Sequence, residues 1–241
     1  GKSNQLRASD IKRITDTVIG RITTPGYSRA VTLKEIRENE YNLNIPRYIE
    51  KDSGAEHWDI RSLMFGGIPE IEIDELKSYW AALPGLRKAL FAGDGHYAQL
   101  VAADVESACN AHQSVQGFRK RFADAFAGLS DYLKQQLLDQ TETLLIPHEE
   151  TVLCADIFDR LASIPLIDKY EAFQLLDDAW TKIAVDLEIL QTEGADAAKK
   201  VDPNMVLKKK DGKENEVQEG WIGHVMPFQL TQEKLLASEL N

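Results

Sequence analysis

The sequence has few of the features that mark a secreted, membrane-spanning or metal-binding protein. Among 241 residues it has only two cysteines, and neither has a second Cys or a His at metal-ligand spacing. We therefore expect Cys109 and Cys154 to be reduced thiols. No apolar run approaches the roughly 18–20 residues of a membrane span, and no apolar stretch follows Lys2 as it would in a signal peptide. These absences favour a cytoplasmic protein with no membrane partner.

Positive charge is also scarce, and it is unevenly distributed. The net charge is −11, which argues against a protein that binds nucleic acid through charge alone. Residues 1–50 carry nine Lys/Arg and six Asp/Glu, a charge of +3, so residues 51–241 carry −14. Any contact with phosphate is expected in this basic head. An excess of +3 over fifty residues is small, however, and can equally be without meaning.

Motifs for catalysis are missing. "GKS" at residues 1–3 resembles the end of a phosphate-binding loop, but the strand and the earlier glycine of that motif do not precede it. The five histidines form no H-E-x-x-H pattern, and no G-x-S-x-G occurs. "KKK" at 208–210 is interpreted as part of a solvated loop or, alternatively, as a phosphate contact. The residues themselves therefore identify no catalytic, cofactor-binding or metal-ligating position.

Apolar residues recur with helical periodicity over most of the chain, which predicts a mainly α fold with a bundle-like helical body. Thr32 and Glu35 form a candidate capping box at the start of a short helix, and Thr231 is a candidate N-cap for a last one. The helices are expected at 9–20, 33–39, 74–83, 86–91, 104–138, 148–163, 168–192 and from 231 onward.

One of these helices carries a heptad seam. Five apolar residues follow one another at steps of 3, 4, 3 and 4 between positions 173 and 187. The seam is too short for a free coiled coil, but it suits a helix packed against one or two antiparallel neighbours. The predicted helix-packing interface therefore comprises Phe173, Leu176, Trp180, Ile183 and Leu187.

Few segments indicate strands. "YNLNIPRYI" at 41–49 alternates with a period of two, and Pro46, which lacks an amide hydrogen, places it at a sheet edge or a strand end. We expect at most a small β element there and a second near 221–228. Residues 92–100 and 193–219 are predicted to be loops. A polar, glycine-containing stretch suggests two domains, residues 1–55 and residues 56–241.

Set in order, these pieces resemble a known family. Residues 27–50 closely resemble the signature "Y-S-R-x-V…E-I…Y-N-L-N-I-P-R-Y" of the modification subunit of type I restriction-modification systems, an adenine-specific DNA methyltransferase. Three further stretches are similar to the C-terminal part of that subunit. They are "NQLRASDIKRITDTV" (4–18), "GGIPEIEIDELKSYWAALPGLRKALF" (66–91) and "LIDKYEAFQLLDDAW" (166–180).

The resemblance implies N6 methylation of DNA adenine with S-adenosylmethionine. It also implies partners: a specificity subunit, a restriction subunit in the full complex, and DNA through that complex. The glycine-containing cofactor loop and the N-P-P-F motif of the family do not occur here. The chain is therefore expected to be a C-terminal fragment that binds no cofactor and does not methylate by itself.

What the resemblance leaves to this chain is a supporting role. Residues 1–55 would close the methyltransferase domain, and the acidic helical body would contact another subunit. Arg29, Lys34 and Arg47 are the candidate contacts to DNA or a partner. The alternative is a stand-alone helical scaffold for protein interaction, unrelated to DNA.

Overall fold

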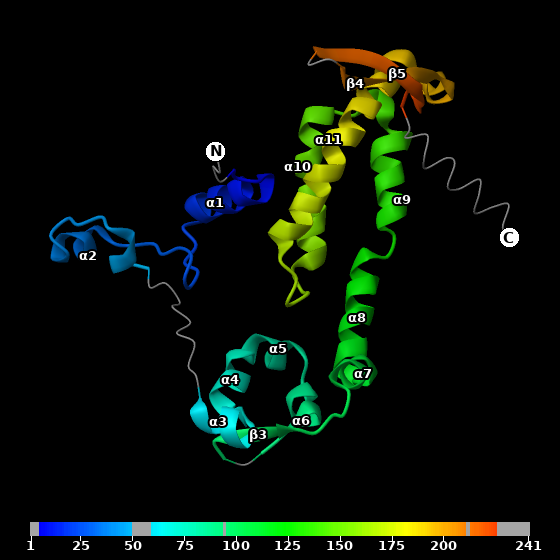
Figure 1. Ribbon diagram of the computed structural model, residues 1–241. Helices are drawn as coiled ribbons and strands as arrows, with labels where there is room; N and C mark the ends of the chain where they lie inside the picture. The colour runs from blue at the N-terminus through cyan, green and yellow to red at the C-terminus, as the bar shows by residue number, and fades with distance from the viewer. Residues whose placement is uncertain (1–4, 50–58, 94, 211–212, 226–241) are drawn as a thin grey trace. The chain divides into compact units, whose positions relative to one another are not determined.

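The structure, a computed structural model, describes residues 5–49, 59–93, 95–210 and 213–225 (Figure 1). Over these residues the protein is mainly helical, with one three-stranded and one two-stranded antiparallel sheet. The predicted fold class is therefore confirmed. None of the helices in the described residues is long and apolar enough to cross a membrane.

The chain forms two compact units, and each is assembled from two separate stretches. The first unit comprises residues 1–126 and 157–174, and the second comprises residues 127–156 and 175–241. The chain passes between the units three times, twice within a helix: α10 (Ile146–Leu161) and α11 (Lys169–Glu193). The predicted boundary at 55/56 lies outside the described residues and stays a prediction.

The first described segment contains α1 (Ala8–Gly20), α2 (Leu33–Glu38) and the 3-10 helix η1 (Ile45–Arg47). The backbone amide of Arg7 donates to Asp10 at the start of α1. Thr32 Oγ1 accepts from the amide of Glu35 at 3.2 Å, so the Thr32 half of the predicted capping box is confirmed, while the Glu35 carboxylate pairs with Arg29. Both helices lie where the sequence predicted them.

The strand predicted at 41–49 is wrong. The amides of Glu40 and Tyr41 donate to the carbonyls of Arg37 and Ile36, and Glu40 adopts a φ of 56°, so a Schellman motif ends α2. Asn42 Oδ1 then accepts from the amide of Asn44 at 2.9 Å, and η1 follows. Local hydrogen bonds from asparagine, together with the reversal after α2, outweigh the period-two pattern.

Residues 59–100 form short helices around a small sheet. Strand β3 (Tyr97–Leu100) lies between β1 (Ile68–Pro69) and β2 (Phe91–Ala92), so the loop predicted at 92–100 is wrong at its second half. Trp80 donates through Nε1 to the carbonyl of Ile73 and packs edge-on against Phe91. The accompanying helices are α3 (Ile60–Phe65), α4 (Glu70–Glu75), α5 (Lys77–Ala82) and α6 (Leu86–Leu90).

The long helical pattern predicted at 104–138 is confirmed, although it is interrupted. The backbone of His112 is extended, and its ring nitrogen Nδ1 accepts from the amide of Ser114. A new helix therefore begins directly after His112. That second helix ends just before Gly128, which has a φ of +74°, a left-handed conformation that costs glycine little. The resulting pieces are α7 (Val105–Ala111), α8 (Gln113–Phe126), α9 (Leu129–Leu133) and the π-helical turn η2 (Lys134–Asp139).

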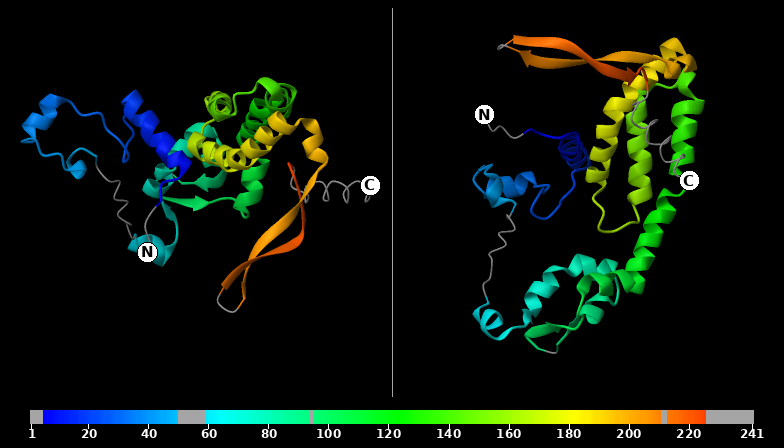
Figure 2. Two further views of the ribbon diagram at one scale, coloured as in Figure 1. Left: turned by 90° about the horizontal axis from the view of Figure 1, so that it is seen from above. Right: turned by 45° about the vertical axis from the view of Figure 1, so that its right-hand side comes forward.

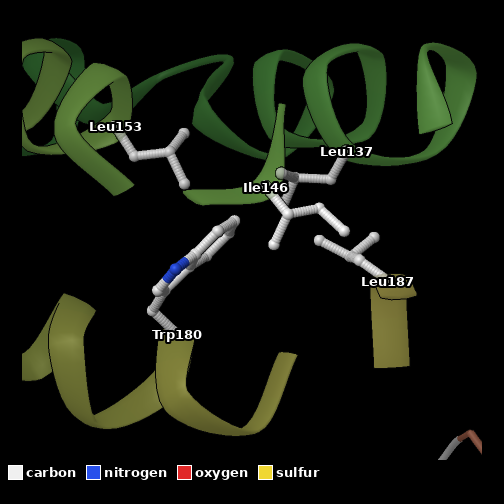
Figure 3. Packing of buried hydrophobic residues seen from close by; sticks show 5 residues of the cluster. All are labelled: Leu137, Ile146, Leu153, Trp180 and Leu187. Carbon is white, nitrogen blue, oxygen red and sulfur yellow. The ribbon is translucent and has the colours of Figure 1, made fainter. Parts of the chain in front are cut away.

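The hydrophobic core of the second unit lies where η2, α10 and α11 meet (Figure 3). Trp180 and Leu187 of α11 pack there with three apolar residues from the other elements, Leu137, Ile146 and Leu153. Leu176 packs against this cluster, whereas Ile183 is 39% exposed. Phe173, the first residue of the heptad seam, is buried in the first unit.

The second unit ends in a β-hairpin, which Figure 2 shows as a long twisted ribbon. Strand β4 (Val201–Lys210) pairs antiparallel with β5 (Lys213–Gly223), with Val206 opposite Val217 and an irregularity between Pro203 and Met205. The loop predicted at 193–219 is therefore wrong: this range contains the 3-10 helix η4 (Ala195–Lys199) and most of the hairpin. Of the β element predicted near 221–228, residues 221–223 belong to β5 and residues 226–228 lie outside the described residues, as does the predicted last helix. The short 3-10 helix η3 (Thr141–Thr143) precedes α10.

Candidate docking surface

Helix α1 has an apolar stripe that faces solvent. Ile11, Ile14 and Val18 recur at helical spacing and are 54%, 43% and 69% exposed. In a globular protein such a stripe normally faces the core, because burial of apolar side chains is what stabilises an amphipathic helix. Over the described residues, this face of α1 is therefore uncovered.

The polar side of α1, in contrast, contacts the start of α11. Arg7 forms an ion pair of 2.7 Å with Glu171, and the amide of Ser9 donates to Gln174 Oε1 at 3.0 Å. Arg13 lies 3.5 Å from Asp168. The hydrogen bonds that the Arg7 guanidinium donates to the Glu171 carboxylate raise the pKa of Arg7. Polar contacts, rather than apolar burial, therefore link α1 to the start of α11 within the first unit.

Aromatic rings complete this contact. The Arg13 guanidinium lies over the rings of Tyr27 and Tyr170, 4.6 Å and 5.5 Å from their centroids. Lys12 lies over the ring of Phe158, which itself packs edge-on against Tyr170. Burial raises the pKa of Tyr170, and the neighbouring Asp16 adds to this effect. Cation–π pairs of this kind contribute about 0.5–1 kcal/mol each at exposed sites.

The whole segment from residue 5 to residue 49 lacks an apolar core of its own. Ser9 is the one residue among them that is buried, and its hydroxyl oxygen has no hydrogen-bond partner. Large apolar side chains at least two-fifths exposed recur along it: Leu6, Ile11, Ile14, Val18, Ile19, Ile22, Tyr27, Leu33, Tyr41, Leu43 and Ile45. Exposed apolar side chains of this kind and number are typical of surfaces that take part in an interaction.

A groove of about 730 Å³ lies between the end of α1 and the start of α2. Val18, Ile22 and Leu33 give it an apolar lining, and Arg21 and Arg29 add positive charge. Arg21 caps α1 in a left-handed conformation with a φ of 47°. Arg21 was not among the predicted contacts to DNA or a partner. Its place directly after Gly20, where the helix was predicted to stop, could have indicated a basic group at a helix end.

Of the three residues predicted to contact DNA or a partner, Arg29 forms a close ion pair, with Glu35. Arg29 binds Glu35 at 2.7 Å and donates to the carbonyl of Tyr48 at 3.2 Å, so its guanidinium ties α2 to the residue after Arg47. Lys34 is 86% exposed and lies 3.8 Å from Glu38, and Arg47 is exposed. Arg29 thus organises the local fold, while Lys34 and Arg47 present their charges to solvent. Contact of these residues with DNA or a partner stays a prediction.

The arrangement combines an apolar lining with positive charge. The groove is lined by Val18, Ile22 and Leu33 together with the guanidinium groups of Arg21 and Arg29 and the hydroxyl groups of Thr17, Ser28 and Thr32. The described parts of the chain contain no group of three or more His, Cys, Asp or Glu residues that could hold a metal ion.

Comparison with known proteins singles out the same segment. Residues 1–57 match the family model of N-6 DNA methylases. The match includes the segment 5–49, which has no apolar core of its own, and it supports a relationship to adenine DNA methyltransferases. Exposed apolar side chains also occur outside the match, among them Ile60 and Phe65. The match covers 57 of 241 residues. No curated protein matches the chain, and no solved structure does.

Proposed function

We propose that this chain is the C-terminal support and subunit-interaction region of a type I restriction-modification DNA adenine N6-methyltransferase subunit. The observation that carries the proposal is the coincidence of the N-6 DNA methylase match with a coreless segment. The apolar stripe of α1 and the exposed Leu33 and Ile45 would be covered by the catalytic part of the methyltransferase. Removing that apolar area from water would stabilise the assembly.

Each part of the chain then has a role. Residues 1–57 complete the methyltransferase domain, and the helical body, with its charge of −14 after residue 50, contacts the specificity subunit rather than DNA. Lys34 and Arg47 contact DNA or a partner from the basic head. S-adenosylmethionine binds to the catalytic part, outside this chain, and the restriction subunit joins the cytoplasmic complex for cleavage.

The test is methyl transfer by the full-length subunit together with its specificity subunit. We expect tritiated methyl groups from S-adenosylmethionine to reach N6 of adenine in DNA. Val18→Glu, on the exposed stripe of α1, should lower this activity because it places a charge where the catalytic part packs. Ile71→Glu is the matched control, since Ile71 is 67% exposed but lies outside the matched residues.

Two results would contradict the proposal. One is a wild-type complex that transfers no methyl group to adenine. The other is calorimetric binding of S-adenosylmethionine by this chain alone, because the cofactor loop is expected outside it. A reading frame without an N-P-P-[FY] motif before residue 1 would instead favour the stand-alone helical scaffold.

A further inference from the structure

A second groove, of about 750 Å³, lies within the second unit. Its walls come from the end of η2 with the following η3, from the C-terminal part of α11, and from η4. Val225, which follows the hairpin, closes one side. All of its lining residues lie between positions 138 and 225, so the groove is separate from the segment that matches the methylases.

The floor of this groove is apolar and partly open. Leu187 is buried in the core of the unit, and Val225 is buried as well. Leu138 is 58% exposed and Ile183 is 39% exposed, although both lie among these apolar neighbours. Ile183 belongs to the heptad seam of α11 between the core residues Trp180 and Leu187, but it lines the groove instead of joining the core cluster.

The charges around the floor have one sign. Asp139, Glu142 and Asp186 line the groove, and among the residues that the structure describes no Lys, Arg or His does. Burial raises the pKa of Asp186, because it removes part of the water around the carboxylate. A cation placed beside it would offset this effect, because an opposite charge favours the ionised form.

We propose that this groove binds an amphipathic helix of a partner protein whose apolar face is flanked by Lys or Arg side chains. Apolar anchors from such a helix would cover Leu138 and Ile183, and its basic residues would pair with Asp139, Glu142 and Asp186. This is the helix-in-groove mode of recognition, with charge complementarity selecting the partner. The site does not depend on the methyltransferase assignment, because it lies outside residues 1–57.

The chain's own last residues fit this groove less well. Residues 226–241 contain two glutamates and one lysine, so their charge has the same sign as the rim. A second copy of the chain has a net charge of −11 and fits poorly for the same reason.

The test uses the full-length chain and fluorescein-labelled helical peptides made of leucine and lysine, with the leucines on one face. Fluorescence anisotropy measures the affinity. The comparison peptide carries glutamate in place of lysine and should not bind. We expect Leu138→Gln/Ile183→Gln to weaken binding of the lysine peptide about tenfold or more, which corresponds to about 1.4 kcal/mol.

The matched control is Leu175→Gln/Val185→Gln. Both residues lie on α11, are more than half exposed and do not line the groove. This double variant has the same net charge and should bind like the wild type. Asp186→Asn should weaken binding of the lysine peptide and reduce its advantage over the glutamate peptide. Circular dichroism melts establish that each variant is folded.

Four outcomes would overturn the proposal. Equal losses in the two double variants would show that the peptide binds exposed apolar side chains in general rather than the groove. Unchanged binding in both, since neither alters the net charge, would show that the peptide follows the net charge of the chain. A dimer in sedimentation velocity that the groove variant dissociates would make a second copy the occupant. Tighter peptide binding by Leu235→Gln would assign the groove to the chain's own last residues.

Discussion

Arg7 and Glu171 form an ion pair of 2.7 Å although 164 residues separate them in the sequence. This pair marks the point where the segment related to N-6 DNA methylases meets the helical body, at the start of α11. Both side chains are about half exposed, and isolated pairs of this kind contribute little to stability because water and salt screen them. The contact of α1 must therefore depend on several such interactions acting together.

Arg13 takes part in three of the interactions around α1. Arg13→Ala removes the ion pair with Asp168 and the contacts with the rings of Tyr27 and Tyr170, so we expect the amides of α1 to exchange faster. The loss should be roughly 1 kcal/mol of local stability. Hydrogen exchange followed by mass spectrometry measures it. Arg13→Lys should recover only part, since lysine has no planar group to stack. Unchanged protection of α1 in Arg13→Ala would contradict this role.

The core of the second unit depends on Trp180. Truncation to alanine leaves a cavity among Leu137, Ile146 and Leu153, so we expect the free energy of unfolding to fall by about 3–5 kcal/mol. Urea denaturation followed by circular dichroism measures the change. Leu175→Ala is the control on the same helix, because Leu175 is 74% exposed and should shift stability by less than about 0.5 kcal/mol. Similar effects of the two substitutions would contradict the packing.

Glu150 is expected to make the stability of the second unit depend on pH. Burial raises its pKa above the ordinary 4.5, and the adjacent Asp177 adds to the shift. Because the folded-state pKa is raised, its contribution to stability is present below the unfolded-state pKa and is lost as pH rises through the folded-state pKa. Glu150→Gln should therefore raise the melting temperature at pH 7 and leave it nearly unchanged at pH 4. Glu188→Gln, at an exposed position of α11, is the control. An equal gain at both pH values would contradict the assignment.

His224 links the base of the hairpin to the end of α11. Its Nδ1 lies 2.6 Å from Asp202 of β4 and its Nε2 lies 3.1 Å from Glu193, which also pairs with Lys200. The hydrogen bond with Asp202, then that with Glu193, raises the pKa of His224 above 6.5. This stabilisation is present below the unfolded-state pKa and is lost as pH rises through the raised folded-state value.

We therefore expect the protection factors of β4 and β5 amides to fall between pH 6 and pH 9 more in the wild type than in His224→Gln. Hydrogen exchange corrected for intrinsic rates measures this difference. His148→Gln serves as the control because His148 is exposed on another element. The interpretation would be wrong if the wild type and His224→Gln showed the same pH dependence.

The helices were predictable where a single apolar periodicity determines the structure. The steps between Phe173 and Leu187 placed α11 within a residue or two of its observed ends, and Thr32 placed the start of α2. The turn at 40–47 was not predictable from alternation, because the positive φ of Glu40 and the side-chain bond of Asn42 follow from how α2 ends.

The hairpin was missed for a different reason. Its strands contain many charged residues, and this composition was interpreted as a loop. The useful signal was the Asp-Gly pair at 211–212, which is typical of two-residue hairpin turns. Lys210 pairs with Lys213, so these two residues alone separate the strands. The exposure of the α1 stripe could not have been predicted either, because periodicity identifies an apolar face without showing what covers it.

The division into two units has a consequence for how this protein can be taken apart. Since the chain crosses from one unit to the other at 126/127, 156/157 and 174/175, no single cleavage releases either unit with all of its segments. Two of these crossings fall inside α10 and α11. Genetic exchange of one unit for that of another protein would need three junctions, two of them in mid-helix.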